Sequence, residues 1–364
     1  MTASAGGIGR HVASLASRLL TLGHDVTVYC PEATAGVHGF SDLGVEVRPL
    51  TQLYRARRAD VLHAHGYKAG ALAVAAAAIG GPPVVVTWHN AILGRTRGSG
   101  PSRQGALDRR RVLGRRRVLG RLNQLLVARG ADLTLGASSD LVAEARRLGA
   151  RAARLGPVAA PVLPAVSQGR NQLREELGIA DHDVLVLTVG RLAPQKNLDM
   201  VLDTAAKLAH RRGIEFAIVG EGPERPRLTD RIRRQRLPVR LLGSRSDIAG
   251  LLHAADLMLL TSAWEARALV AQEALLAGLP LVATRVGGIE ELVGDAAILL
   301  PPGDASAAAD AVVRLADDPG RRAELTAAGR SRAGDWPDED AVTADVCAAY
   351  RDVIASSSRA REPG

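Results

Sequence analysis

Short apolar runs alternate along the chain with segments whose apolar residues recur at helical spacing. Runs bounded by turn residues indicate buried strands, and the sequence predicts these at residues 26–30, 45–50, 60–65, 83–87, 132–138, 183–189, 216–219, 239–243, 255–260 and 281–284. Helical spacing predicts helices at residues 10–22, 69–79, 171–177, 198–210, 269–276 and 339–354. Because strands alternate with helices, we expect an α/β fold with doubly wound parallel sheets.

The chain is long enough for two domains, and one proline-rich segment without periodicity divides it. We expect a Rossmann-like domain at residues 1–155, a linker at 156–170 and a second Rossmann-like domain at 171–335. A last helix is expected at 336–355, followed by a disordered tail at 356–364.

The start of the chain carries glycines at positions 6, 7 and 9 ahead of a predicted helix. Such a loop normally follows a buried strand, and none precedes residue 5. We therefore expect the first strand to be encoded upstream of Met1. The alternatives are a sheet with one strand fewer and a flexible N-terminal tail.

The composition, 47% hydrophobic and 23% charged residues, is typical of a soluble globular protein. The net charge of +9 favours anionic partners such as nucleotide sugars or acidic lipid headgroups. Nucleic acid is disfavoured because aromatic residues for base stacking make up only 2%. Cys30 and Cys347 form no metal or redox pattern, which fits a cytoplasmic protein.

Residues 104–129 are strongly basic and contain the sequence R-R-R-V-L-G twice. Leucine and valine residues give the segment an apolar side. A basic amphipathic helix can lie on an anionic membrane surface, which predicts a peripheral location on the inner membrane face. The alternative is a solvated helix with arginines on its outer face.

The candidate chemistry centres on residues 264–294, where two predicted strands each lead into a helix. Glu265 follows the first strand and Glu273 lies eight residues further on, roughly 12 Å along a helix axis. That spacing is similar to the separation of sugar and ribose in a sugar nucleotide. The amides of Leu269 and Val270 at the helix start, with a second cluster at Gly287 and Gly288, are expected to bind the diphosphate between them.

A second basic cluster follows the strand at 183–189. Arg191 and Lys196 lie between this strand and the next helix, where a planar fork and a point charge together can clamp a diphosphate. The Asp-x-Asp sequence at 181–183 precedes the strand and is interpreted as a turn.

Three histidines, His63, His65 and His89, lie at the predicted carboxyl ends of strands. No carboxylate or thiolate accompanies them at ligand spacing, so the sequence predicts no metal site. A lone histidine at a strand end is more often a satisfied core residue.

Taken together, these motifs resemble those of retaining glycosyltransferases of family 4, the glycosyl transferases group 1. The match consists of Glu265 to Glu273 as Glu-x7-Glu, the following A-G-L-P-L-V-A-T and V-G-G-I-E-E-L-V, G-R-L-A-P-Q-K-N at 190–197, V-G-E-G-P at 219–223 and T-W-H at 87–89. The resemblance implies two Rossmann-like domains of the GT-B type facing across a cleft, with the last helix packing back on the N-terminal, acceptor-binding domain.

The resemblance also implies roles for individual residues. Glu265 would face the donor sugar, Glu273 would hold the ribose hydroxyls, and Arg191 with Lys196 would bind the diphosphate. His89 would meet the sugar from the N-terminal domain. The remaining donor-binding positions lie at the ends of loops and strands: Gly7, Leu242, Gly243, Leu269, Val270, Gly287 and Gly288.

The implied reaction is retaining transfer of a sugar from a nucleotide-diphosphate donor to the hydroxyl of a glycan, lipid or small molecule, without metal or cofactor. One departure from the family pattern is Ala266-Arg267-Ala268, where a small residue, Phe and Gly are usual, and we expect it to affect the choice of sugar. The alternatives are a catalytically silent sugar-nucleotide-binding protein and a related sugar-nucleotide epimerase.

Overall fold

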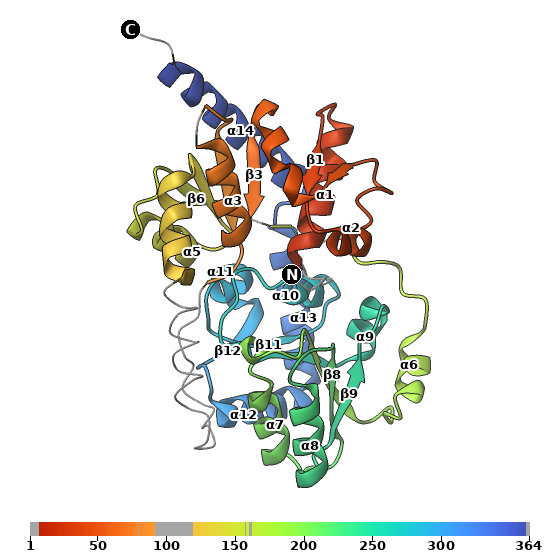
Figure 1. Cartoon of the computed structure of the whole chain (residues 1–364). Helices are drawn as coiled ribbons and strands as arrows, with labels where there is room; N and C mark the ends of the chain where they lie inside the picture. Colours follow the sequence, from red (N-terminus) through yellow and green to blue (C-terminus); the bar gives the residue numbers. More distant parts are fainter. Residues whose placement is uncertain (1–6, 79, 92–118, 157, 160–161, 362–364) are drawn as a thin grey trace. The chain divides into compact units, whose positions relative to one another are not determined.

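A computed structural model describes residues 7–361 except 79, 92–118, 157 and 160–161. The chain divides into two compact units, Met1–Pro161 together with Pro337–Gly364, and Val162–Trp336. In Figure 1 the dark-blue C-terminal helix accordingly belongs with the red and orange elements of the first unit. Both units are built from helices and parallel strands.

The first unit begins with a small sheet of two strands. Its elements are α1 (Gly7–Thr21), β1 (Thr27–Tyr29), α2 (Glu32–His38), β2 (Glu46–Arg48) and the 3₁₀ helix η1 (Leu50–Arg58). Strands β1 and β2 pair in parallel. Leu15 and Leu19 of α1 pack against Val346 and Cys347 of the C-terminal helix α14 (Glu339–Arg361), which ties the two ends of the chain into one unit.

A four-stranded parallel sheet forms the rest of this unit. It contains β3 (Leu62–His65), α3 (Tyr67–Ala77), β4 (Val84–Trp88), a helix at residues 119–130, β5 (Leu133–Gly136), α5 (Ser139–Arg147) and β6 (Ala153–Leu155), with the strands in the order β3-β4-β5-β6. Helix α14 covers one face, where Ala349 and Val353 pack on Val85. Helix α3 covers the other face at Gly70, where an added Cβ would come within 2.9 Å of Val86.

Several sequence-based predictions for this unit were wrong. The described strands form two sheets instead of one, and β6 is a strand beyond the last one predicted. Gly7 lies in the first turn of α1 and not in a loop. The predicted tail is helical as far as Arg361, because the hydroxyls of Ser356 and Ser358 donate to the carbonyls four residues earlier, which a continuing helix accommodates.

The second unit is a doubly wound parallel sheet. Its elements are α6 (Arg170–Glu176), β7 (Val184–Val189), η2 (Pro194–Lys196), α7 (Leu198–Lys207), β8 (Ile214–Val219), α8 (Arg225–Gln235), β9 (Val239–Gly243), α9 (Ile248–Ala254), β10 (Leu257–Leu260), α10 (Leu269–Leu276), β11 (Leu281–Thr284), α11 (Ile289–Val293), η3 (Gly294–Ala296), β12 (Ala297–Leu300), α12 (Ala305–Asp317) and α13 (Pro319–Gly334). The strand order is β12-β11-β10-β7-β8-β9. Strand β12 was not predicted from the sequence.

The alternation of side chains along the strands gives this sheet two buried faces. Val186 and Phe216 lie in one cluster with apolar residues of α7, α8 and α12, whereas Leu185 and Leu187 lie in the other with residues of α9, α10 and α11. The chain winds outward in one direction from β7 and in the other from β10, so the switch point of the sheet lies between these two strands. Ligands of such sheets bind at the carboxyl ends of the strands at this point.

A buried ion pair fixes the start of this unit to its sheet. Arg174 of α6 is only 1% exposed and donates to Asp256 Oδ2 at 3.1 Å. The same guanidinium donates to the carbonyls of Ala254, Ala180 and Asp183. Asp256 in turn accepts from the Leu185 amide at 2.8 Å, so a single carboxylate joins α6, β7 and the start of β10.

Replacing Arg174 by Ala is expected to lower the free energy of unfolding by about 1–3 kcal/mol, because three backbone carbonyls would lose their buried donor, while Asp256 keeps its ion pair with Arg170. Chemical denaturation monitored by circular dichroism measures this. The control is Arg233→Ala, which removes an 82% exposed side chain from an ion pair with Asp230. That change should cost less than about 1 kcal/mol, and similar losses in the two variants would show that the Arg174 network contributes little.

Candidate active site

Two turns of the second unit meet at the switch point. The first, here called the β7 turn, comprises residues 190–197, and the second, the β10 turn, comprises residues 261–268. Each follows one of the two central strands and leads into a helix, α7 or α10. The sequence prediction that polar groups leave both strands at one edge is therefore consistent with the sheet order.

Hydrogen bonds hold these two turns together. The Ala263 amide donates to the Gln195 carbonyl at 2.8 Å, and the Gln195 side-chain amide donates to the Trp264 carbonyl at 2.9 Å. The Thr261 hydroxyl donates to the Lys196 carbonyl at 3.0 Å. Because each turn donates hydrogen bonds to the other, the position of Lys196 is fixed relative to the residues after Trp264.

Lys196 and Glu265 form an ion pair between the turns. Lys196 Nζ lies 2.5 Å from Glu265 Oε1, and the Ser262 hydroxyl donates to the same oxygen at 2.6 Å. The Lys196 and Glu265 side chains are 21% and 10% exposed. In such a poorly solvated setting the attraction between the charges is stronger than at the surface. The sequence analysis expected both residues at one site but not this contact.

Glu273 lies on α10, in the second turn of the helix, and is only 4% exposed. The N-terminus of α10 is capped by Ala268, which has no side-chain acceptor. Among the described residues, no backbone carbonyl accepts from the amides of Leu269 or Val270. Unpaired amides at a helix start attract an anion through both the N–H groups and the helix dipole.

Gly287 and Gly288 follow β11 and pack against the β10 turn. Gly287 has φ +53°, and an added Cβ would lie 1.9 Å from the Glu265 carbonyl oxygen. The Gly288 amide donates to that carbonyl at 2.9 Å. The expectation that both glycine amides are available to the diphosphate was therefore wrong for Gly288, because its N–H already holds Glu265 in place.

The ends of β8 and β9, on the side of β7 away from β10, also lie close to the β7 turn. An added Cβ on Gly220 would lie 2.0 Å from the Gly190 carbonyl oxygen, so the exit of β8 lies against the β7 turn. The Gly220 amide donates to the Gly243 carbonyl at 2.7 Å, which brings the end of β9, with Leu242, beside it. Arg191 is exposed, and no described residue accepts a hydrogen bond from its guanidinium.

Arg267 replaces an aromatic residue of the family pattern and makes an aromatic contact of its own. Its guanidinium carbon lies 6.0 Å from the centre of the Trp336 ring. Burial lowers the pKa of Arg267 to about 10, with Glu291 raising it and Arg332 lowering it. The charge is thus retained at neutral pH and is placed against residues near the end of α13.

His89 and Gly7 belong to the first unit. His89 follows β4 and its Nε2 lies 3.1 Å from His65 Nδ1. His63 points elsewhere, with its ring nitrogens 2.8 Å from the Tyr350 hydroxyl and 2.7 Å from the Thr87 hydroxyl. The sequence analysis missed His11 of α1, whose ring centre lies 5.5 Å from that of His89.

Comparison with known proteins agrees with this arrangement. The family model described as a glycosyl transferase 4-like domain matches residues 6–160, and the model of the glycosyl transferases group 1 matches residues 183–318. The chain belongs to the group 1 glycosyl transferases. The two matches fall in the two units of the structure.

The chain is similar to several named glycosyltransferases and to a glycogen synthase. Alpha-D-kanosaminyltransferase of Streptomyces kanamyceticus is 36% identical over 163 residues, which is 43% of this chain and 42% of that protein. Glycogen synthase of Mycobacterium tuberculosis is 29% identical over 94% of this chain and 90% of its own length. The match thus spans about two fifths of the kanosaminyltransferase and nearly all of the synthase.

Solved structures share the fold over almost the full length. Anabaena HepE in complex with UDP-glucose has a TM-score of 0.79 and 21% identity, covering 97% of this chain and 98% of that one. Sucrose-phosphate synthase from Thermosynechococcus elongatus has a TM-score of 0.72 and 21% identity, covering 96% and 94%. The architecture is that of the GT-B glycosyltransferases. Within the described residues, no helix combines the length and apolar character needed to cross a bilayer.

Gly287→Ala is expected to lower the free energy of unfolding by about 1–3 kcal/mol more than Gly303→Ala, because only the former adds a collision. Both glycines have positive φ, +53° and +81°, but nothing lies within 4 Å of a Cβ at Gly303. The shared backbone strain therefore cancels in the comparison. Chemical denaturation of the two variants tests this, and equal losses would mean that the Glu265 carbonyl yields without cost.

Proposed function

We propose that this chain is a retaining glycosyltransferase that moves a sugar from a nucleoside-diphosphate donor to an acceptor hydroxyl. The observation that carries the proposal is the Lys196–Glu265 pair at the switch point of the second unit, next to the unpaired amides at the start of α10. A carboxylate, a cation and a helix N-terminus at one strand edge suit a ligand with a neutral sugar and a diphosphate.

The diphosphate would be held by groups of the protein itself. Lys196 and the exposed Arg191 supply positive charge, and the amides of Leu269, Val270 and Gly287 supply hydrogen-bond donors. Negative charge on the diphosphate grows as the glycosidic bond breaks, so these contacts strengthen in the transition state and accelerate the reaction. In this proposal the leaving group needs no metal ion.

Glu265 and Glu273 would have different roles. Glu265 would face the donor sugar, whereas Glu273, eight residues further on, would accept hydrogen bonds from the ribose hydroxyls. Because Glu265 pairs with Lys196, a bound diphosphate would share the ammonium group and leave Glu265 oriented towards the sugar. His89 of the first unit would contact the sugar as well. The HepE complex with UDP-glucose makes that nucleotide sugar the first donor to test.

Glu273→Gln is expected to weaken nucleotide binding by about tenfold or more, since a charge-assisted hydrogen bond contributes ~1.5–3 kcal/mol. Glu265→Gln should instead lower turnover and leave nucleotide affinity nearly unchanged. Calorimetry with nucleoside diphosphates and a transfer assay measure the two effects separately, and Glu324→Gln, at a 67% exposed position on α13, is the control. Equal losses of affinity in the two variants would contradict these roles.

The configuration of the product tests the reaction itself. Retention at the anomeric carbon, read by nuclear magnetic resonance from transfer or from slow donor hydrolysis, supports the proposal. Inversion contradicts the retaining mechanism. Tight donor binding without transfer or hydrolysis would instead identify a catalytically silent binding protein, and a changed sugar on the intact donor an epimerase.

We further propose that the first unit binds an anionic membrane surface. On the helix at residues 119–130, Leu119, Leu122 and Leu126 are 65%, 56% and 48% exposed, and their spacing places them on one side. Val127 of the same helix is fully buried, so the exposed leucines are an outer face. The basic residues at 104–118 lie outside the described part of the chain, but their charge, with the net charge of +9, matches acidic lipid headgroups.

Replacing Leu119, Leu122 and Leu126 by Gln is expected to reduce binding to vesicles containing phosphatidylglycerol by at least tenfold. Each buried leucine contributes about 1.5–3 kcal/mol. Co-sedimentation with vesicles measures the effect, and Leu22→Gln, at a 60% exposed position, is the control. If wild-type chain does not sediment with these vesicles, or the triple variant sediments equally, the membrane proposal is wrong.

A further inference from the structure

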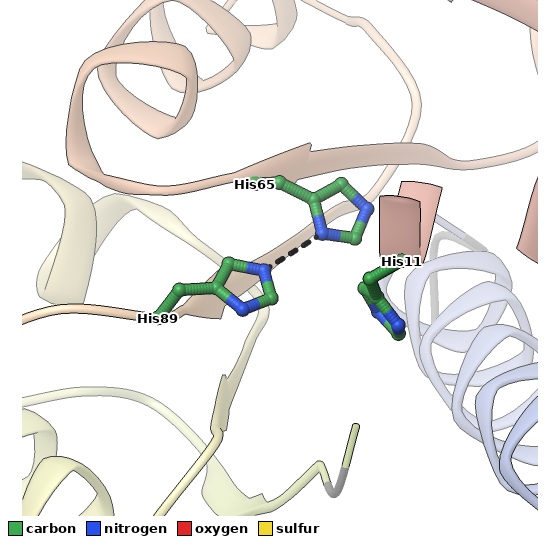
Figure 2. Close-up of side chains that lie close together, drawn as sticks. All are labelled: His11, His65 and His89. Atoms are coloured by element: carbon green, nitrogen blue, oxygen red, sulfur yellow. Dashed lines mark hydrogen bonds between the residues drawn. The ribbon is translucent and has the colours of Figure 1, made fainter. Parts of the chain in front are cut away.

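Three imidazole rings gather in the first unit, each from a different element. His11 comes from α1, His65 from the end of β3 and His89 from the residue after β4 (Figure 2). One ring nitrogen of each lies within 4.8 Å of the others. Figure 2 shows His65 and His89 joined by their hydrogen bond, with the His11 ring beside them. Elements distant in the sequence thus converge on one small volume.

His63 is excluded from this group because both of its ring nitrogens are already engaged by Tyr350 of α14 and Thr87 of β4. Its ring centre lies 4.3 Å from that of His65. His63 therefore packs against His65 and limits the rotation of the His65 ring. His11, in contrast, has no hydrogen-bond partner among the residues that the structure describes, although it is largely removed from water.

The three rings are in the neutral form that metals bind. Burial lowers the pKa of His11 to about 4, although the Glu339 carboxylate of α14 opposes this shift. Burial also holds the pKa values of His65 and His89 well below their usual range. Arg18 donates to Glu339 at 2.9 Å and so neutralises the nearest carboxylate. Neutral imidazole is the commonest metal ligand in proteins.

We propose that His11, His65 and His89 bind a divalent transition metal ion, of which zinc is the best match. Zinc binds imidazole nitrogen at about 2.0–2.1 Å in tetrahedral geometry, which separates two ligand nitrogens by roughly 3.3 Å. The distance of 3.1 Å between His65 Nδ1 and His89 Nε2 is close to this value. For the same geometry, the His11 ring has to move inward by about 1 Å.

Metal binding replaces the hydrogen bond between His65 and His89. The proton now shared between Nδ1 and Nε2 moves to the remaining nitrogen of the ring that carries it, so both facing nitrogens offer lone pairs and no proton is released. The described part of the chain adds no carboxylate or thiolate to this cluster. Three histidines with an open fourth position leave room for water or a substrate hydroxyl.

A consequence rests on the proposed function. If His89 contacts the donor sugar during transfer, a bound metal ion withdraws its Nε2 from that contact. Zinc would then inhibit sugar transfer, while nucleotide binding in the second unit continues. Metal binding at this site would thus inhibit the enzyme.

The test measures metal binding by the full chain without using activity. Co²⁺ is added as a spectroscopic probe, and binding of one equivalent per chain with the visible absorption of a low-symmetry Co²⁺ complex is expected, followed by displacement with Zn²⁺. His11→Gln and His65→Gln should each weaken Co²⁺ binding by at least tenfold. The matched control is His24→Gln, because His24 is an exposed histidine of the same unit. Circular dichroism confirms that each variant is folded.

Two results would overturn the site: wild-type chain that binds no Co²⁺ or Zn²⁺, or a folded His11→Gln or His65→Gln variant that binds Co²⁺ as tightly as the wild type. Separate results test the metal site and the proposed transfer activity. If the chain binds one metal ion through these histidines but transfers no sugar, the metal site is supported and the proposed function is contradicted. If the chain transfers sugar at an unchanged rate while metal is bound, the metal site is supported but its inhibitory effect is contradicted.

Discussion

The ion pair between Lys196 and Glu265 is the interaction on which the candidate active site depends. It joins the two turns that leave the central strands β7 and β10, and it is supported from three sides: by Ser262, by the hydrogen bonds of Gln195 and by the Gly288 amide on the Glu265 carbonyl. These supports exist because the sheet winds outward in both directions from this pair of strands. A sheet of another order would place the two turns apart.

Much of this site could be predicted from the sequence, for a physical reason. A buried strand, a glycine or small-residue turn and a helix follow one another within a few residues, so the pattern alone places Arg191, Lys196, Glu265 and Glu273 at strand exits. Parallel strands bring all their exits to one edge, so the pattern predicts which edge carries these residues, whereas their direct contact depends on β7 and β10 being neighbours. The buried Glu273 and the uncapped start of α10 agree with that reasoning.

What the sequence did not reveal depends on contacts between distant segments. His11 lies on an amphipathic helix, and no local pattern relates it to His65 or His89. The use of the Gly288 amide by the Glu265 carbonyl is equally invisible, because a glycine pair predicts available amides but not their acceptor. The strands β6 and β12 lie at sheet edges and are mostly not buried, and their pairing comes from neighbours already in the sheet.

The most direct test of the account compares a nucleoside diphosphate with its parent nucleoside in wild-type chain, Lys196→Ala and the control Lys207→Ala, which lies in the last turn of α7. Calorimetry is performed with whichever of UDP, GDP and ADP binds best. The account predicts that Lys196→Ala weakens diphosphate binding by at least tenfold, about 1.4 kcal/mol, and leaves nucleoside binding unchanged, while Lys207→Ala alters neither. Equal diphosphate affinities in wild-type chain and Lys196→Ala would show that the pair at the switch point is not the diphosphate site.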